Sequence, residues 1–404
     1  MNNSLERRKV LFLSFTYPSR AGSGSQLRSA ALIRMLAAKA EVHLLIAGYV
    51  QNLGGPPDPE IERLCRHVTY LRIPPGANEC WPKLKTDAET VALNTIDSSA
   101  DRIADDIVQY YRKNELDSLF VFRFDSLHFI CHHLDAFPWR ELDLDELPTR
   151  NQAELARVGR ALWERSAASA ARLMERAFLP RFHRLFVASA FEAEEVRQRT
   201  GVADALVLPN IYPSRALPPQ PPATGRQEIL FVGNLAYPPN SDAVLYFCRE
   251  IFPLIRKAKG DGVLFRVIGM GATKVLDPVK NQPGVEMMGY QKDLAPFHAQ
   301  AALVAVPLRA GTGTRLKILE AFALGRVTVS TSIGAQGLDV IDRKHILLAD
   351  DPTAFARACI EVMDDPNLAA RIRAEAYRLV RDRYSEEALL RCYADIAAPQ
   401  SSES

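Results

Sequence analysis

The segment from Val306 to Gly337 constrains the fold of this chain more than any other stretch of the sequence. We expect a short apolar strand over Ala302–Val306 and a second over Val327–Ser330, joined by a glycine-rich loop and a helix that Thr314 caps. Two strands joined through a helix are typical of a parallel sheet with helices on its faces. The segment therefore predicts an α/β fold.

The same loop and helix have the residue types of an anion site. Glycines at 311 and 313 let the backbone approach a ligand closely, and the N–H groups at a helix start attract anions. Lys317 falls in the first turn, and Glu320 follows on the same helical face. One interpretation is a nucleoside diphosphate held by the loop and Lys317, with Glu320 accepting hydroxyl protons. The other is a glycine-rich turn into a helix with a Lys317–Glu320 surface pair.

Length and composition limit the class of protein. A chain of 404 residues suggests two domains, and a net charge of +2 argues against a general nucleic-acid binder. The six cysteines are scattered without a C-x-x-C pair, which favours free thiols in a reducing compartment over a zinc site. No apolar run approaches the roughly 20 residues of a membrane span, and the start has no secretory segment. We expect a cytoplasmic protein.

The N-terminal part begins with a βαβ unit. A buried strand (Val10–Phe15), a turn-rich loop (16–25), a helix (Gln26–Lys39) and a strand (Glu41–Ala47) follow one another. The loop follows the carboxyl end of its strand, so Gly22, Ser23 and Gly24 are expected to face a ligand. Leu27 stands where a dinucleotide fingerprint has its third glycine, which disfavours NAD. Arg28 either reaches the cleft or lies on a solvated helix face.

Polar residues also follow later strands. After strands at Val68–Ile73 and Asp117–Phe122, the residues Arg123, Asp125 and His128 are site candidates by position. For His128, His132 and His133, structural roles are favoured over a metal cluster. A strand over Trp139–Leu144 leads into the D-x-D run 143–145, for which a cleft-lining acidic loop is favoured over a Mg²⁺ site. No metal is expected.

A long arginine-rich helix is expected over Arg157–Arg184. It either touches an anionic membrane surface, as a peripheral contact at the inner face of the membrane, or presents a solvated basic face. A strand at Leu185–Ala188 and a capping box, Ser189 with Glu192, come next. A proline-rich linker over Tyr212–Thr224 then separates the first domain from a second α/β region.

The second region alternates strands and helices like the first. Expected strands are Ile229–Val232, Leu264–Ile268, Val285–Met288 and one around His345–Leu348; expected helices are Ser241–Lys257 (broken at Pro253), Leu294–Ala301, Pro352–Met363, Pro366–Arg383 and Ser385–Ile396. Two consecutive doubly wound domains imply a cleft between them.

The chain resembles the family-4 glycosyltransferases of GT-B architecture. The resemblance lies in the Leu11–Ser14 strand with its loop, Leu208-Pro209-Asn210, Phe231-Val232-Gly233-Asn234, Gly289-Tyr290 and above all the run from Gly313 to Gly325. It implies two Rossmann-like domains facing across a cleft: an acceptor-binding domain (1–212), a donor-binding domain (213–384) and a C-terminal helix (385–404) crossing back. It also implies metal-independent, retaining transfer from a nucleotide sugar, without a cofactor, to a glycan, lipid-linked or small-molecule acceptor.

Carried over position by position, the resemblance makes Glu320 the second glutamate of the family's E-x7-E motif, which binds the donor ribose. Thr312 stands at the first glutamate, and both residues of the usual basic pair after Gly233 are absent, so Lys317, with Arg309 or Arg315, is expected to replace that charge. The donor-binding residues are then Gly233, Asn234, Gly269, Met288, Tyr290, Arg309, Gly311, Thr312, Gly313, Thr314, Lys317 and Glu320. Catalysis is assigned to Lys317, Arg123, Asp125 and His128, and the acceptor-side loop to Gly22, Ser23, Gly24 and Arg28.

Two other functions stay open on the sequence. Nucleotide-sugar 2-epimerases share the two-domain shape and need no acceptor. The missing glutamate and basic pair also fit a non-catalytic nucleotide-sugar-binding partner.

Overall fold

The computed structural model describes residues 7–20, 22–49, 58–73, 98–157, 165–202, 205–212, 227–271, 274–313 and 315–397. These residues group into two compact units. The N-terminal unit takes in the chain up to residue 152, residues 163–209 and the chain from Leu389 onward, and the C-terminal unit takes in residues 153–162 and 210–388. The linker predicted over 212–224 lies outside the described residues from position 213.

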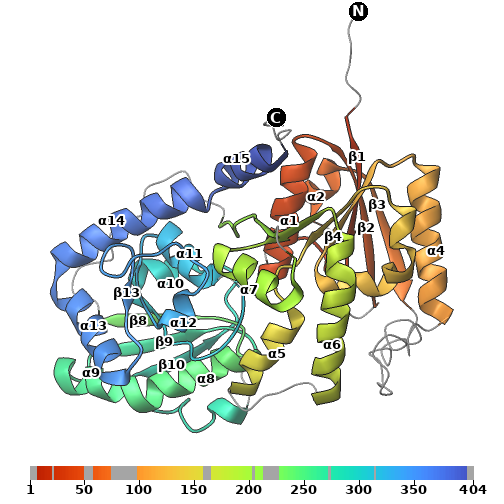
Figure 1. Ribbon diagram of the computed structural model, residues 1–404. Coiled ribbons are helices and arrows are strands. Elements are labelled where there is room, and N and C mark those ends of the chain that lie inside the picture. The colour runs from red at the N-terminus through yellow and green to blue at the C-terminus, as the bar shows by residue number, and fades with distance from the viewer. Residues whose placement is uncertain are drawn as a thin grey trace, which may run out of the picture. The chain divides into compact units, whose positions relative to one another are not determined.

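The N-terminal unit is built on a seven-stranded parallel sheet in the order β3-β2-β1-β4-β5-β6-β7 (Figure 1). Its strands are β1 (Lys9–Ser14), β2 (Glu41–Tyr49), β3 (Cys65–Ile73), β4 (Ser118–Phe122), β5 (Arg140–Asp143), β6 (Arg184–Val187) and β7 (Ala205–Val207). The order reverses between β1 and β4, so the loops that follow these two strands diverge at a topological switch point.

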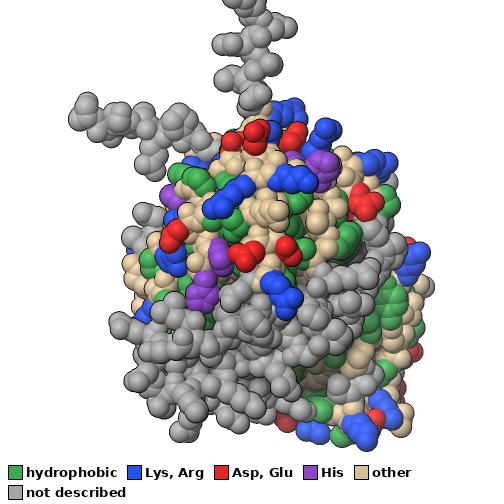
Figure 2. Space-filling model, turned by 90° about the vertical axis from the view of Figure 1, so that its right-hand side faces the viewer, with side chains coloured by type: hydrophobic (Ala, Val, Ile, Leu, Met, Phe, Trp, Pro, Cys, Tyr) green, Lys and Arg blue, Asp and Glu red, His purple; other side chains and the backbone are tan. Residues whose placement is uncertain are grey.

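Helices cover this sheet. They are α1 (Gly24–Ala37), α2 (Pro59–Leu64), α4 (Ser98–Lys113), α6 (Arg165–Phe178), α7 (Ala190–Thr200) and the last helix, α15 (Glu386–Ala397), with short 3₁₀ turns η2 (Phe124–Phe129), η3 (Cys131–Ala136) and η4 (Leu179–Arg181). Helix α5 (Pro148–Arg157) has its second half in the C-terminal unit. The Tyr393 ring of α15 lies 6.5 Å from the Phe186 ring of β6. Lys, Arg, Asp and Glu side chains are interspersed over the face of this unit in Figure 2.

The C-terminal unit is built on a six-stranded parallel sheet in the order β10-β9-β8-β11-β12-β13. Its strands are β8 (Glu228–Val232), β9 (Leu264–Ile268), β10 (Val285–Gly289), β11 (Leu303–Val306), β12 (Val327–Ser330) and β13 (Leu347–Leu348). Its helical segments are α8 (Pro238–Tyr246), the π-helical turn η5 (Phe247–Ile251), α9 (Phe252–Lys259), η6 (Lys274–Leu276), α10 (Ala295–Gln300), α11 (Leu316–Ala323), α12 (Ser332–Ala335), α13 (Pro352–Asp364) and α14 (Pro366–Arg383). The strand order reverses between β8 and β11.

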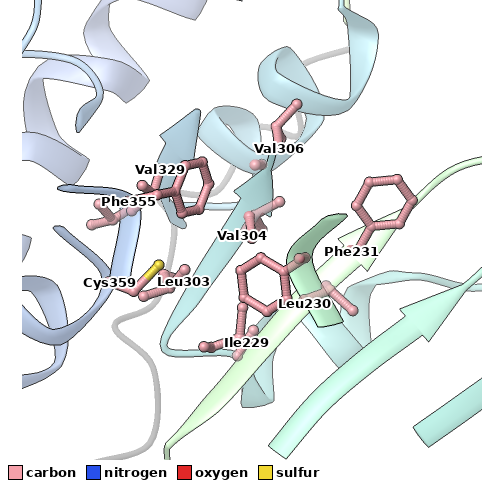
Figure 3. Close-up of a cluster of buried hydrophobic side chains, with 14 of the residues drawn as sticks. Ile229, Leu230, Phe231, Leu303, Val304, Val306, Val329, Phe355 and Cys359 are labelled. Carbon is pink, nitrogen blue, oxygen red and sulfur yellow. The ribbon is translucent and has the colours of Figure 1, made fainter. Parts of the chain in front are cut away.

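The core of the C-terminal unit explains why its strands are nearly all apolar. Side chains from β8, β11 and β12 meet Phe355 and Cys359 of α13, as Figure 3 shows, and all are almost fully buried. A parallel strand covered by helices on both faces has no solvated side to alternate with. This burial fixes the sheet rigidly beneath the loops at its carboxyl edge.

Two expected helices differ from the structure. The helix predicted over Arg157–Arg184 is wrong at its end: α6 stops at Phe178, and Arg184 already belongs to β6. Pro180 lacks the N–H that a continuing helix needs, so the chain leaves through a 3₁₀ turn. The break predicted at Pro253 is confirmed to within two residues: a new helix, α9, begins at Phe252, with Pro253 in its first turn, where no N–H is required. The irregular part is the π-helical turn before it.

Among the described residues, no helix is both long and apolar enough to cross a membrane.

Candidate functional site

The carboxyl ends of β8 and β11 define the candidate site, because the strand order of the sheet reverses between them. The turn after β8 lies against the turn after β9: the Gly233 N–H donates to the Ile268 carbonyl at 2.9 Å, and a Cβ on Gly269 would lie 1.8 Å from the Gly233 oxygen. The Gly269 N–H donates in turn to the Gly289 carbonyl at 2.9 Å. Glycine is required where backbones approach this closely.

Lys317 lies directly beside this turn. It is the second residue of α11, and its Nζ donates to the Asn240 Oδ1 of α8 at 2.7 Å. The same ammonium lies 4.3 Å from the centre of the Phe231 ring, a cation–π distance. A Cβ on Gly233 would lie 2.9 Å from Lys317 Nζ. Two helices and one glycine turn therefore meet at a single, partly buried ammonium.

The environment of Lys317 disfavours its charge. Burial, together with the neighbouring charge of Arg315, lowers the pKa of Lys317 to about 7, against the opposing effect of Glu320. Among the described residues its contacts are an amide oxygen and an aromatic face instead of a carboxylate. An anion arriving here would supply the negative charge that the protein does not place against this lysine.

Glu320 lies one helical turn from Lys317 but has a different partner. The hydroxyl of Tyr212 donates to Glu320 Oε1 at 2.9 Å. Burial raises the pKa of Glu320, while the Tyr212 hydrogen bond and the charge of Lys317 oppose that rise. The interpretation of these two residues as a surface ion pair is wrong, since both are partly buried, the lysine donates to Asn240 and the glutamate accepts from Tyr212.

Arg315 closes the glycine-rich loop after β11. Its Nη1 donates to the carbonyls of Thr312 and, at 2.7 Å, of Gly313. Gly311 (φ 122°) and Gly313 (φ 72°) both have backbone angles that favour glycine. The helix begins at Leu316 with Arg315 at the N-cap position, and Thr314, the expected cap and donor residue, lies outside the described residues.

The Arg309 side chain is bound to Asp242. Its guanidinium forms two hydrogen bonds with the Asp242 carboxylate, at 3.0 and 2.5 Å, and lies 4.6 Å from the centre of the Tyr246 ring. Arg315 is bound to loop carbonyls and Arg309 to Asp242. Of the three basic side chains expected to bind the diphosphate, Lys317 is therefore the one without a carboxylate or backbone carbonyl partner among the described residues.

Other predicted donor residues lie along the same edge of the sheet. Asn234 Oδ1 accepts the Ala236 N–H at 3.0 Å, so its side chain shapes the turn after β8. The Met288 carbonyl accepts from Gln291 at 2.9 Å in the turn after β10. Tyr290, in that turn, is 66% exposed. Thr312 is buried, so its side chain faces the protein interior at the position of the missing first glutamate.

In the N-terminal unit, Arg123 gathers the polar side chains at the switch point. Its Nη1 donates to Ser25 Oγ at 2.7 Å, and its Nη2 lies 3.3 Å from Asp125 and 3.5 Å from Glu146. Its backbone has φ 69°, an unusual value for a residue with a side chain. The His128 side chain lies outside the described residues.

The acceptor-side loop divides into exposed and buried parts. Gly22, Ser23 and Gly24 are exposed, and Ser23 N–H donates to Gln26 Oε1 at 2.9 Å at the start of α1. Arg28 is only 4% exposed and donates to both oxygens of Asp143, at 2.8 and 2.6 Å.

The Arg28–Asp143 pair therefore corrects the interpretations of both residues. Arg28 neither reaches a cleft nor lies on a solvated face, and its placement in the acceptor-side loop is wrong for its side chain. Asp143 neither lines a cleft nor stands free for a metal, because burial of both groups makes the ion pair a structural one.

Sequence reasoning missed Asn240 and Tyr212. A signal for Asn240 was present: the pair Pro238-Pro239 is typical of a helix start, which puts Asn240 in the first turn of α8 beside the glycine turn. Tyr212 had no such signal, because its partner Glu320 lies 108 residues away in the sequence.

Residues 226–365 match the family model of "Glycosyl transferases group 1". A curated relative, an "Uncharacterized 44.6 kDa protein in cps region" of Klebsiella pneumoniae, is 22% identical over 167 residues, which cover 39% of this chain and 43% of that protein. The chain thus spans less than half the length of the curated relative that it matches.

Two solved structures have the same fold over nearly the whole chain. HepE of Anabaena, crystallised with UDP and in another crystal with UDP-glucose, is 14% identical with a TM-score of 0.67, covering 96% of this chain and 99% of that one. Sucrose-phosphate synthase of Thermosynechococcus elongatus is 17% identical with a TM-score of 0.66, covering 96% and 98%. These likenesses confirm the expected α/β fold, the GT-B architecture of two Rossmann-like units.

Proposed function

We propose that this chain moves a sugar from a nucleoside diphosphate sugar to a hydroxyl of an acceptor, because residues 226–365 match the family model of the group 1 glycosyl transferases. The acceptor is a glycan, a glycolipid or a small molecule. Transfer retains the anomeric configuration and uses no metal and no cofactor. The UDP and UDP-glucose complexes of HepE support a diphosphate sugar as the donor.

The partly buried ammonium of Lys317, which has no carboxylate partner among the described residues, is the observation that carries this proposal. The leaving nucleoside diphosphate gathers negative charge as the glycosidic bond breaks, and a fixed cation in a dry site stabilises that charge strongly. Lys317 stands at the switch point of the C-terminal sheet, beside the turn at Gly233, where a Cβ would lie 2.9 Å from Lys317 Nζ. Glu320, on the same helix face, accepts hydrogen bonds from the ribose hydroxyls.

The transfer step follows from this electrostatic arrangement. The bond from the anomeric carbon to the phosphate oxygen breaks, and its electron pair stays on that oxygen. The acceptor oxygen forms the new bond on the same face, and its proton passes to the departing phosphate oxygen. Lys317 and the loop N–H groups of residues 311–313 stabilise the diphosphate, so no separate base is required.

We assign acceptor binding to the N-terminal unit. The exposed loop at Gly22, Ser23 and Gly24 and the polar group of Arg123 and Asp125 follow β1 and β4, where ligands of such sheets bind. His128 is proposed with them by its position in the sequence.

A transfer assay tests the proposal. Purified protein is incubated with labelled UDP-, GDP- and ADP-sugars, with and without glycan acceptors, in EDTA, and the anomeric configuration of the product is read by NMR. We expect acceptor-dependent, EDTA-resistant release of the diphosphate with retention. Donor turnover without any acceptor would instead indicate an epimerase, and inversion would contradict the proposed stereochemistry.

A further inference from the structure

We propose that Tyr212 is a positioning residue that holds the Glu320 carboxylate in place for the ribose hydroxyls of a nucleoside diphosphate. The inference rests on the proposed function, since it assigns to Glu320 the ribose of the donor. It adds a residue from outside the segment that predicted the site. The Tyr212 hydroxyl donates to Glu320 Oε1 at 2.9 Å across 108 residues of sequence.

Tyr212 is itself anchored, so it can fix another side chain. Its backbone N–H donates to the Tyr384 carbonyl at 3.0 Å, just after α14. The Tyr384 side chain is buried, and its hydroxyl accepts the Asp339 N–H at 2.7 Å. The Tyr212 backbone is therefore held at the C-terminal end of α14, and its phenol reaches Glu320 from this fixed position.

A glutamate binds ribose hydroxyls more tightly when a hydrogen-bond partner such as Tyr212 fixes its side chain. Its side chain has three rotatable bonds, and ordering them costs conformational entropy that weakens ligand binding. An ionised carboxylate has about four acceptor positions on its two oxygens. The phenol takes one of these at Oε1, which orients the carboxylate and leaves Oε2 for vicinal hydroxyls.

The hydrogen bond also affects the charge of Glu320. Burial raises the pKa of this carboxyl, and the Tyr212 hydroxyl is the larger of the two opposing effects, ahead of Lys317 on the same helix. Arg315, at the start of that helix, adds a positive charge near Lys317. Removing the hydroxyl should raise the pKa of Glu320 further, so the carboxylate would be protonated, and ribose binding weakened, at a higher pH.

The test compares wild type, Tyr212→Phe and the control Tyr377→Phe, a tyrosine of α14 that takes no part in these contacts. Calorimetric titration first finds which of UDP, GDP and ADP binds the wild type, and then measures that nucleotide and its 2′-deoxy form for all three proteins. We expect the wild type to prefer the ribose form. In Tyr212→Phe, ribonucleotide affinity should fall about tenfold, the preference over the deoxy form should shrink towards unity, and the loss of binding in acid should move to higher pH.

The outcomes separate the inference from the function on which it rests. If Tyr212→Phe keeps both the wild-type preference and its pH profile, Tyr212 does not position Glu320, while the proposed function stands. If Tyr377→Phe loses the preference equally, the effect is a general loosening and the inference is overturned. If the wild type binds none of the three diphosphates, both the proposed function and this inference are wrong.

Discussion

At the residue scale, the position of Lys317 was predictable from the sequence, but its environment was not. Its place in the first turn of a helix after a glycine-rich loop was predicted from spacing. Its burial was not, because burial depends on Asn240 and Phe231, which approach from other elements. The pKa of about 7 follows from that burial and is invisible in a sequence.

Replacing Lys317 with methionine should separate function from stability. The change removes a buried charge whose pKa is held far below that of a free lysine, so the melting temperature of the empty protein should not fall. The transfer rate should fall by about 10²–10³-fold, the usual effect of removing one group that stabilises a developing anion. Differential scanning fluorimetry and the transfer assay measure the two quantities. A clear loss of stability with normal turnover would make Lys317 a structural residue.

His298 gives a pH-dependent prediction outside the site. Its side chain is 1% exposed, neither ring nitrogen has a hydrogen-bond partner among the described residues, and burial with the Arg326 charge lowers its pKa to about 3. The unfolded chain binds a proton below about pH 6.5, whereas the folded chain does not until about pH 3. This histidine therefore costs no stability above pH 6.5 and an increasing amount as the pH falls below it.

Urea unfolding of wild type and His298→Leu at pH 7.5 and pH 4.5 tests this sign. Between these values the wild type should lose about 2.5 kcal/mol more unfolding free energy than the variant. An equal loss in both proteins would show that His298 titrates normally in the folded state.

At the element scale, the paired glycine turns of the C-terminal sheet predict two different defects. A Cβ on Gly233 meets only side-chain ends, Lys317 Nζ at 2.9 Å and Asn240 Nδ2 at 3.0 Å. Gly233→Ala should therefore cost at most about 1 kcal/mol of stability but weaken nucleotide binding about tenfold or more. A Cβ on Gly269 meets the Gly233 carbonyl oxygen at 1.8 Å, so Gly269→Ala should lose about 2–4 kcal/mol.

Gly262→Ala is the control for these variants, because a Cβ there meets no atom within 4 Å. Its stability and nucleotide affinity should match the wild type. Chemical unfolding and calorimetric titration of the three variants supply both quantities. Equal affinities in Gly233→Ala and wild type would mean that the glycine turn and Lys317 do not form a binding site.

Element types were more predictable than element ends and partners. The strands were predicted because buried parallel strands read as continuous apolar runs, and α7 because Ser189 caps it and its side chain accepts the Glu192 N–H. The end of α6 was missed although Pro180, a local signal, marks it, and the π-helical form of the turn before Pro253 was not predicted. The Arg28–Asp143 pair was missed because it joins residues 115 positions apart.

At the scale of the whole molecule, two parallel sheets each place their functional candidates at a switch point. In one, Arg123 gathers Ser25, Asp125 and Glu146 beyond β1 and β4; in the other, Lys317 lies beyond β8 and β11. The repetition of this plan was predicted from the alternation of apolar runs and amphipathic segments. The family match over residues 226–365 falls on the unit with the buried lysine.

The central claim is that this lysine site binds a nucleoside diphosphate. We would measure the melting temperature of wild type and Glu320→Ala with UDP, GDP, ADP, CMP and NAD. A ligand at 100 times its dissociation constant stabilises a protein by about 2.7 kcal/mol, which such a measurement detects easily. We predict that a nucleoside diphosphate raises the melting temperature of the wild type and that the variant loses the effect. Stabilisation by NAD alone, or by no diphosphate, would contradict the claim.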